Sequence, residues 1–173
     1  MKKHASLVSL IVAVLALLIF CLWYTAPRTA EELFSGFRWS EADSISGTYT
    51  FYTANDPGKA PINNFGATDE FQAGSDPFNS MLSLLRDLEY RRSLRNLLPS
   101  GTRTHLIHPG DLNAAAQVSS EKGIFTVQFW FEHVYVYYDG QKYRCSIDQQ
   151  QETAAALLAL LQANATETDI YAR

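Results

Sequence analysis

Residues 105–111, His-Leu-Ile-His-Pro-Gly-Asp, carry the side chains whose types and spacing could bind a metal or perform acid–base chemistry. His105, His108 and Asp111 supply two imidazoles and a carboxylate, which are common zinc ligands. On a strand, however, side chains three positions apart point to opposite faces. The Pro-Gly turn signal comes only after the second histidine, too late to bring both imidazoles to one metal. We therefore expect no metal site and no cofactor.

Other local catalytic motifs are absent from the sequence: it contains no G-x-S-x-G, H-E-x-x-H, C-x-x-C, phosphate-binding loop or dinucleotide fingerprint. Two classes of function remain. We favour a binding or scaffolding module over an enzyme. The alternative is a small envelope hydrolase whose acid and base are dispersed in the sequence, with His105, His108 and Asp111 as its only local candidates.

The Asp-Gly pair at residues 139–140 predicts a tight hairpin, because these residues accommodate the positive φ angles of a type I′ turn. This hairpin places Val136 opposite Tyr143 and Val134 opposite Cys145. These four side chains then share one face of the sheet, which we expect to be buried.

A second reversal is required just upstream of that hairpin. In 124–131 one apolar set, Phe125, Val127, Phe129 and Phe131, falls at odd positions, whereas the aliphatic residues of 133–138, Val134 and Val136, fall at even positions. One continuous strand cannot bury both sets, because alternate residues face opposite sides. A turn or a bulge must therefore occur near residues 132–133, and a tight turn there would set Phe131 opposite Val134.

The opposite face of this three-strand meander carries the candidate partner-binding residues. Trp, Tyr and Arg are enriched at binding hot spots because each combines broad contact area with a polar group. A purely structural role, in which these pairs stabilise neighbouring strands, is the alternative. The hairpins predict Tyr135 beside Arg144, Tyr137 beside Lys142 and Trp130 beside Tyr135. The candidate binding residues are Trp130, Tyr135, Tyr137, Lys142 and Arg144.

A membrane anchor is predicted at residues 5–24, which carry no charge. Twenty helical residues span about 30 Å, the thickness of the hydrocarbon core of a bilayer. Lys2 and Lys3 predict that the N-terminus stays in the cytoplasm, while Trp23 and Tyr24 fall at the far interface. A cleaved secretory signal is the alternative, although the candidate cleavage sites after Ala26 and Ala30 have unsuitable flanking residues.

The predicted fold is α+β: an N-terminal transmembrane helix followed by a small domain with an antiparallel meander packed on one face by two helices. The localisation expected is the cell membrane, single-pass, with the C-terminal domain outside the cytoplasm. The domain division is a cytoplasmic stub at 1–4, the anchor at 5–24, a short helix and linker at 25–43, the extracytoplasmic domain at 44–163 and a tail at 164–173.

Within that domain, helical spacing of apolar residues predicts helices at 77–98 and 149–163. A short helix after Thr29 is expected to run to Phe37, because Glu32 completes a capping box. Alternation predicts a strand at about 44–53, and further strands are expected near 103–107 and 113–118. Residues 54–76 lack any period and predict a loop, disordered or functional.

Four arginines, at positions 86, 91, 92 and 95, follow one another along the second half of the first predicted helix. A solvated face with ion pairs between Asp87 and Arg91 and between Glu89 and Arg92 would explain them. A site for an anion or a lipid headgroup is the other interpretation.

The charge balance limits the possible partners. Residues 25–173 contain 12 basic and 18 acidic side chains, a net charge of −6. Nucleic-acid binding normally requires a basic surface, so we expect no nucleic-acid partner. The expected partners are the membrane, through residues 5–24, and a protein or another component of the cell envelope.

Overall fold

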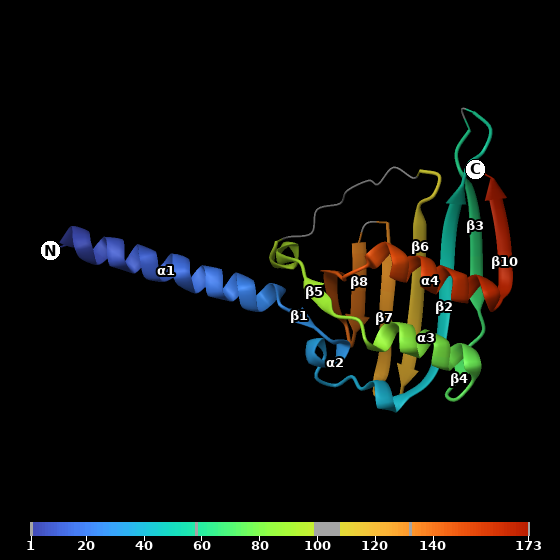
Figure 1. Cartoon of the computed structure of the whole chain (residues 1–173), viewed down its shortest axis with the longest axis horizontal. Helices are drawn as coiled ribbons and strands as arrows, with labels where there is room; N and C mark the ends of the chain where they lie inside the picture. The colour runs from blue at the N-terminus through green and yellow to red at the C-terminus, as the bar shows by residue number, and fades with distance from the viewer. Residues whose placement is uncertain (1, 58, 99–107, 132, 173) are drawn as a thin grey trace.

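The computed structural model describes residues 2–57, 59–98, 108–131 and 133–172, and one antiparallel sheet dominates it (Figure 1). The strands lie in the order β1 (Pro27–Arg28), β5 (Tyr90–Arg92), β9 (Gln141–Ser146), β8 (His133–Tyr138), β7 (Gly123–Trp130), β6 (Leu112–Ser120), β2 (Ala42–Thr53), β3 (Ile62–Thr68) and β10 (Ala165–Ala172), with β4 (Phe71–Gln72) against β2. The fold is therefore α+β, as predicted.

Helix α1 (Lys2–Thr25) projects away from the sheet (Figure 1). Its segment Val8–Thr25 is long and apolar enough to cross a membrane, and the same properties also fit a signal sequence near the N-terminus. Only the end of the helix meets the domain, where the Tyr24 side chain is buried.

Helix α2 (Ala30–Leu33) begins with the predicted capping box. The Thr29 backbone N–H donates to Glu32 Oε2 at 2.9 Å, and the Glu32 N–H donates to Thr29 Oγ1 at 3.4 Å. The helix is shorter than predicted and ends before Phe37. A single 3₁₀ turn, η1 (Trp39–Glu41), then leads into β2. The ring of Phe37 stacks on Phe125 of β7 with centroids 4.3 Å apart, so this segment covers part of the meander.

The first long helix departs most from the prediction. Helix α3 (Asp76–Arg86) ends twelve residues before the predicted end at residue 98, and β5 and the 3₁₀ turn η2 (Leu94–Leu97) follow. Strand β5 adds to the edge of β9, where Arg92 pairs with Cys145. The predicted helical arginine face is therefore wrong. Arg91 instead forms an ion pair with Asp148, with Arg91 NH2 3.0 Å from Asp148 Oδ2.

Two segments without a periodic pattern also join the sheet. The predicted loop at 54–76 contains β3 and β4, and the predicted tail at 164–173 contains β10, which pairs with β3. The prediction of a wholly irregular or disordered 54–76 segment is therefore wrong. The strand predicted near 103–107 lies outside the described residues.

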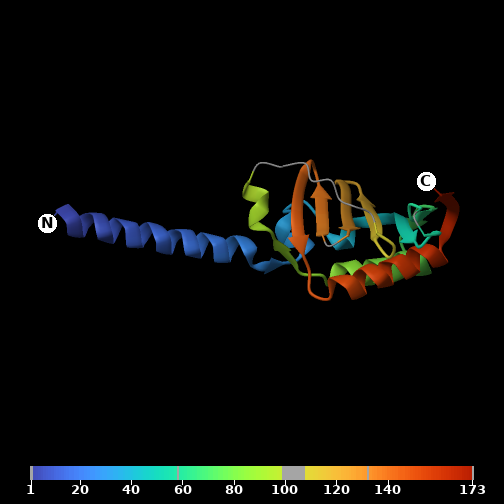
Figure 2. The same ribbon diagram turned by 90° about the horizontal axis from the view of Figure 1, so that it is seen from above.

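Helix α4 (Gln150–Ala163) contacts α3 and also contacts β2, β3 and β6, whereas α3 contacts β2 and β4. Figure 2 shows the two helices side by side. Leu161 of α4 lies close to Gly47 of β2, where a Cβ atom would be 2.3 Å from Leu161 Cδ2. A glycine here permits this close approach. The largest fully buried side chains include Tyr90, Phe37, Phe125, Phe129, Ile45, Met81, Leu85, Leu157 and Leu161.

Candidate functional site

The hairpin between β8 and β9 positions four of the five candidate binding residues. Tyr135 pairs with Arg144 and Tyr137 pairs with Lys142, as predicted. The turn at residues 139–140 has φ angles of 46° and 71°, the positive values for which Asp and Gly are suited. Local turn chemistry therefore fixes this register.

Trp130, the fifth candidate, lies on β7, and its predicted pairing is wrong by two residues. It pairs with His133, whereas Gln128 pairs with Tyr135. The reversal begins at Phe131, whose φ is 54°, rather than at residues 132–133. Phe131 is therefore a half-buried turn residue and does not face Val134. An error of two residues in the pairing does not change the face on which the side chains lie. Trp130 therefore lies on the same face as Tyr135 and contacts it diagonally, with ring centroids 6.3 Å apart.

The Lys142 side chain lies against the rings of both tyrosines on this face. Lys142 Nζ lies 4.4 Å from the ring centroid of Tyr135 and 5.1 Å from that of Tyr137. Both distances are within the range of cation–π attraction. These contacts join the side chains into one surface, which we call the aromatic–basic strip: Trp130, Tyr135, Tyr137, Lys142 and Arg144.

Polar contacts extend the strip across β7 to β6. The Tyr137 hydroxyl donates to Gln128 Oε1 at 3.1 Å, and Gln128 Nε2 donates to Asn113 Oδ1 at 3.2 Å. Asn113 was not among the predicted candidates. No local signal identifies it, because its place beside Gln128 depends on the pairing of β6 with β7.

His133 is another neighbour that the candidate set omitted. Arg144 NH2 lies 2.5 Å and 3.0 Å from the two ring nitrogens of His133. The alternation of His133 with Tyr135 and Tyr137 in the sequence was the signal that could have placed it on this face. The backbone of Arg144 is fixed by Asn96, whose Oδ1 accepts from Arg144 N at 2.9 Å and whose Nδ2 donates to Arg144 O at 3.0 Å.

The strip is accessible but well packed. Trp130 is 42% exposed and Lys142 is also exposed, while the tyrosines and Arg144 are half-buried. Such a surface can contact a partner through aromatic area, cations and hydroxyl groups. It lacks a nucleophile hydrogen-bonded to a base, which acyl transfer by a side chain would need.

The histidine-containing segment forms a turn in its described part. Asp111 Oδ2 accepts from the His108 backbone N–H at 2.7 Å, and the Asp111 N–H donates to His108 O at 3.1 Å. The carboxylate therefore serves as a turn cap. His105 lies outside the described residues. No group of three His, Cys, Asp or Glu side chains that could hold a metal occurs in the described part of the chain.

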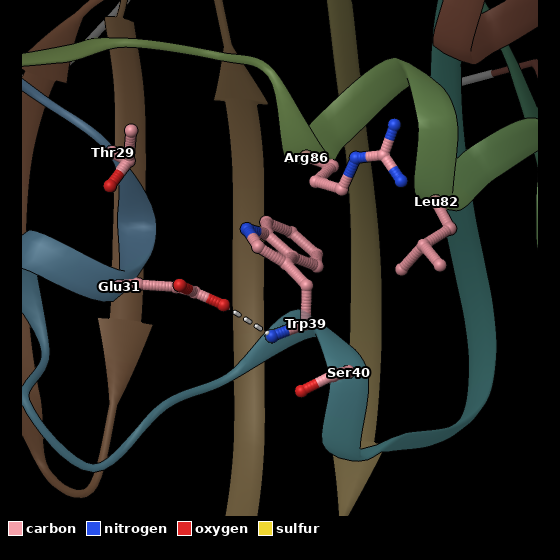
Figure 3. Close-up of a pocket in the computed structure, with 6 residues that line it drawn as sticks. All are labelled: Thr29, Glu31, Trp39, Ser40, Leu82 and Arg86. Carbon is pink, nitrogen blue, oxygen red and sulfur yellow. Dashed lines mark hydrogen bonds between the residues drawn. The ribbon is translucent and has the colours of Figure 1, made fainter.

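A pocket of about 420 Å³ lies between α2, η1 and α3 (Figure 3). In Figure 3, Trp39 lies between Glu31 on one side and Arg86 and Leu82 on the other. Glu31 Oε1 accepts a hydrogen bond from the Trp39 backbone N–H at 2.9 Å. The carboxylate therefore stabilises the start of η1. The described lining contains no histidine to act with this carboxylate.

A second pocket, of about 570 Å³, lies where the end of α1 meets β5, β8 and β9. Its described lining includes His133 and three arginines, at positions 91, 92 and 144, and no carboxylate. In these two pockets, therefore, the described lining residues never combine a histidine with a carboxylate.

Comparison with known proteins adds no assignment to these sites. The candidate sites rest on the residues and contacts described above, and no protein family, curated protein or solved structure matches the chain.

Proposed function

We propose that this protein is a membrane-anchored extracytoplasmic binding or scaffolding module that recognises a component of the cell envelope. The observation that carries the proposal is the aromatic–basic strip. Trp130, Tyr135, Tyr137 and Lys142 form a continuous set of contacts, and Arg144 pairs with Tyr135 beside them, on a face where Trp130 and Lys142 are exposed. Contiguous exposed aromatic surface is typical of binding sites, whereas single exposed aromatics are not informative.

The anchor in this proposal is α1. Its apolar length matches the hydrocarbon core of a bilayer. The positive charges of Lys2 and Lys3 favour a cytoplasmic N-terminus, which would place the sheet domain outside. Trp23 and Tyr24 would then lie at the outer interface, where aromatic rings are enriched.

The strip is available to a partner because the buried side chains use the other face of the sheet. Val134, Val136 and Cys145 are buried, and the residues that alternate with them form the strip. We propose that α3, α4 and residues 30–39 together cover the buried face. The aromatic contacts of Phe34 and Phe37 with Phe125 support this role for the N-terminal segment.

An envelope hydrolase is the second candidate function. It would need an acid and a base that face one cavity. Glu31 lines one pocket and His133 lines the other, and each described lining lacks the complementary group. This separation favours the binding function over the hydrolase.

The test of the binding function is a Trp130→Ala, Tyr135→Ala double variant of the full chain, crosslinked in its native membrane. We expect the fold to persist and the crosslinked partner to be lost. Ile124→Ala is the matched control, because Ile124 is 49% exposed on the same face of β7 but lies outside the strip. A folded double variant that retains every partner, or a double variant that unfolds, would contradict the proposal.

The anchor has a separate test. Protease added to spheroplasts is expected to digest the sheet domain, while the membrane-embedded helix keeps its original N-terminus. N-terminal sequencing of the mature protein provides the measurement. A mature chain that begins near residue 27 or 31 would show that the helix is a cleaved signal.

A further inference from the structure

The pocket at the end of α1 gathers positive charge in an otherwise acidic domain. Arg91 and Arg92 come from β5 and Arg144 comes from β9, while Thr25 is the last residue of α1. Residues 25–173 carry a net charge of −6, so three arginines around one pocket are a local reversal of the overall charge. The described lining holds no carboxylate that would neutralise them within the pocket.

The partners of these arginines leave hydrogen-bonding capacity unused. Arg91 pairs with Asp148, but that carboxylate is 79% exposed and Arg91 itself is 44% exposed. Exposed pairs of this kind contribute little to stability and are easily replaced. Arg91 can therefore turn from Asp148 to an anion at modest cost.

Arg92 is the most unusual member of the group. It is only 9% exposed, and its Nε and NH2 atoms are buried without a hydrogen-bond partner among the described residues. Its guanidinium lies 4.5 Å from the ring centroid of Tyr24 and 5.3 Å from that of Tyr143. The rings attract the cation through their faces, but they offer no acceptor to its N–H groups. A buried cation without an anionic partner is costly.

The remaining polar groups of the pocket suit a tetrahedral oxyanion. Ser93 and Ser146 line it beside the arginines, and Thr25 also lines it, with its hydroxyl donating to Cys21 O at 2.8 Å. Guanidinium groups bind phosphate through paired N–H donors, and hydroxyl groups can donate to the remaining oxygens. Arg91 pairs with Ser146 and so shares the face of Arg144, whereas Arg92 pairs with Cys145 on the buried face at the same edge of the sheet. The charge and hydroxyl groups of this lining match a phosphate group better than a metal cation or an apolar ligand.

The position of the pocket indicates where such a phosphate would come from. Trp23 and Tyr24 immediately precede the pocket residue Thr25, and Arg28 NH2 donates to Trp23 O at 3.2 Å. If α1 spans the bilayer, these aromatic rings mark the level of the lipid headgroups. The phosphates of lipid headgroups would then lie at the mouth of the pocket.

We propose that this pocket binds a phosphate group, presented by an anionic lipid headgroup at the outer end of α1. The site fixes the orientation of the domain on the membrane. The pocket shares Arg144 with the aromatic–basic strip, so its test uses Arg91 and Arg92, which lie outside the strip. The lipid as the source of the phosphate rests on the membrane anchor proposed above.

The experiment uses the full chain in a nonionic detergent and two probes, phosphatidylglycerol and inorganic phosphate. Native mass spectrometry measures lipid binding, and calorimetry measures phosphate binding. We expect Arg91→Gln and Arg92→Gln each to weaken binding at least fivefold. Arg95→Gln is the matched control, because Arg95 is an exposed arginine of η2 outside the described lining, and it is expected to change binding less than twofold.

The two probes separate the possible sources of the phosphate. If the affinity for phosphatidylglycerol exceeds the affinity for inorganic phosphate at least tenfold, the ligand is a lipid headgroup, as proposed. If the two affinities are equal, the pocket binds a soluble phosphate, and the lipid assignment is overturned. Absence of binding by either probe overturns the site. An equal loss in Arg91→Gln and Arg95→Gln also overturns it, because general charge attraction would then explain the binding. If Arg92→Gln fails to fold, Arg91→Gln decides the outcome.

Discussion

Trp130 and Tyr135 meet diagonally across β7 and β8, with their rings 6.3 Å apart and inclined at 67°. They are not directly paired, since Trp130 faces His133 and Tyr135 faces Gln128. Diagonal neighbours on a sheet are within reach of aromatic side chains. This contact connects the exposed indole to the tyrosines and basic residues of the strip.

A double-mutant cycle on Trp130→Ala and Tyr135→Ala should therefore show a small coupling in the free energy of unfolding. We expect about 0.2–1 kcal/mol, the range for cross-strand side-chain pairs. Urea unfolding of the two single variants and the double variant measures it. Additive effects within about 0.1 kcal/mol would show that the rings do not interact in solution.

Phe129→Ala should lower the stability of the domain by about 3–5 kcal/mol, because it removes a fully buried aromatic ring. Trp130→Ala is the control at the next position on the opposite face, and we expect it to cost less than about 1 kcal/mol. Chemical denaturation of both variants provides the comparison. The reverse order of stability would mean that the buried and exposed faces of β7 are exchanged.

Gly66→Ala should destabilise the protein by about 1–3 kcal/mol through overpacking. Gly66 pairs with Tyr49, and a Cβ atom there would lie 2.4 Å from Tyr49 Cε1 and Cζ. The expected loss has a specific signature, because Tyr49→Ala removes the ring and should abolish the additional cost of the alanine. Thermal melting of the single and double variants tests this, and an undiminished cost in the Tyr49→Ala background would exclude the ring as its cause.

Cys145 is expected to make stability depend on pH in the alkaline range. Burial raises the pKa of its thiol to about 12, although the nearby charge of Arg92 acts in the opposite direction. The folded protein therefore keeps a proton that the unfolded chain releases above its ordinary pKa of 9.0. The resulting stabilisation is fully present below about pH 9 and is lost as the pH rises toward 12.

Urea unfolding between pH 7 and pH 10.5 measures this dependence. Cys145→Ala should lose stability less steeply than the native sequence as the pH rises. Cys21→Ala, which leaves the buried thiol in place, should retain the native slope. Part of the slope should survive in Cys145→Ala, since burial also raises the pKa of Tyr90. Identical slopes in Cys145→Ala and the native sequence would refute the prediction.

Local chemistry allowed several elements to be predicted from the sequence alone. The uncharged block predicted an apolar helix, Thr29 and Glu32 predicted a capping box, and residues 139–140 predicted the register of β8 with β9. Each of these features depends on residues within a few positions of one another. Alternation also assigned Trp130 and Tyr135 to the correct face, because an error of two residues in pairing preserves the side on which each residue lies.

Tertiary structure decided the elements whose hydrogen-bond partners are distant in the sequence. The apolar spacing continued past Arg86, but residues 90–92 became a strand because the edge of β9 offers backbone partners. β3 and β10 likewise pair with each other although about a hundred residues separate them in the sequence. Neither segment has the alternating pattern that would predict a strand. The arginine pocket arises in the same way, since it brings Thr25, Arg92 and Arg144 together. Periodicity reports only which face a segment buries, whereas strand pairing is decided by the backbone groups that the rest of the fold leaves available.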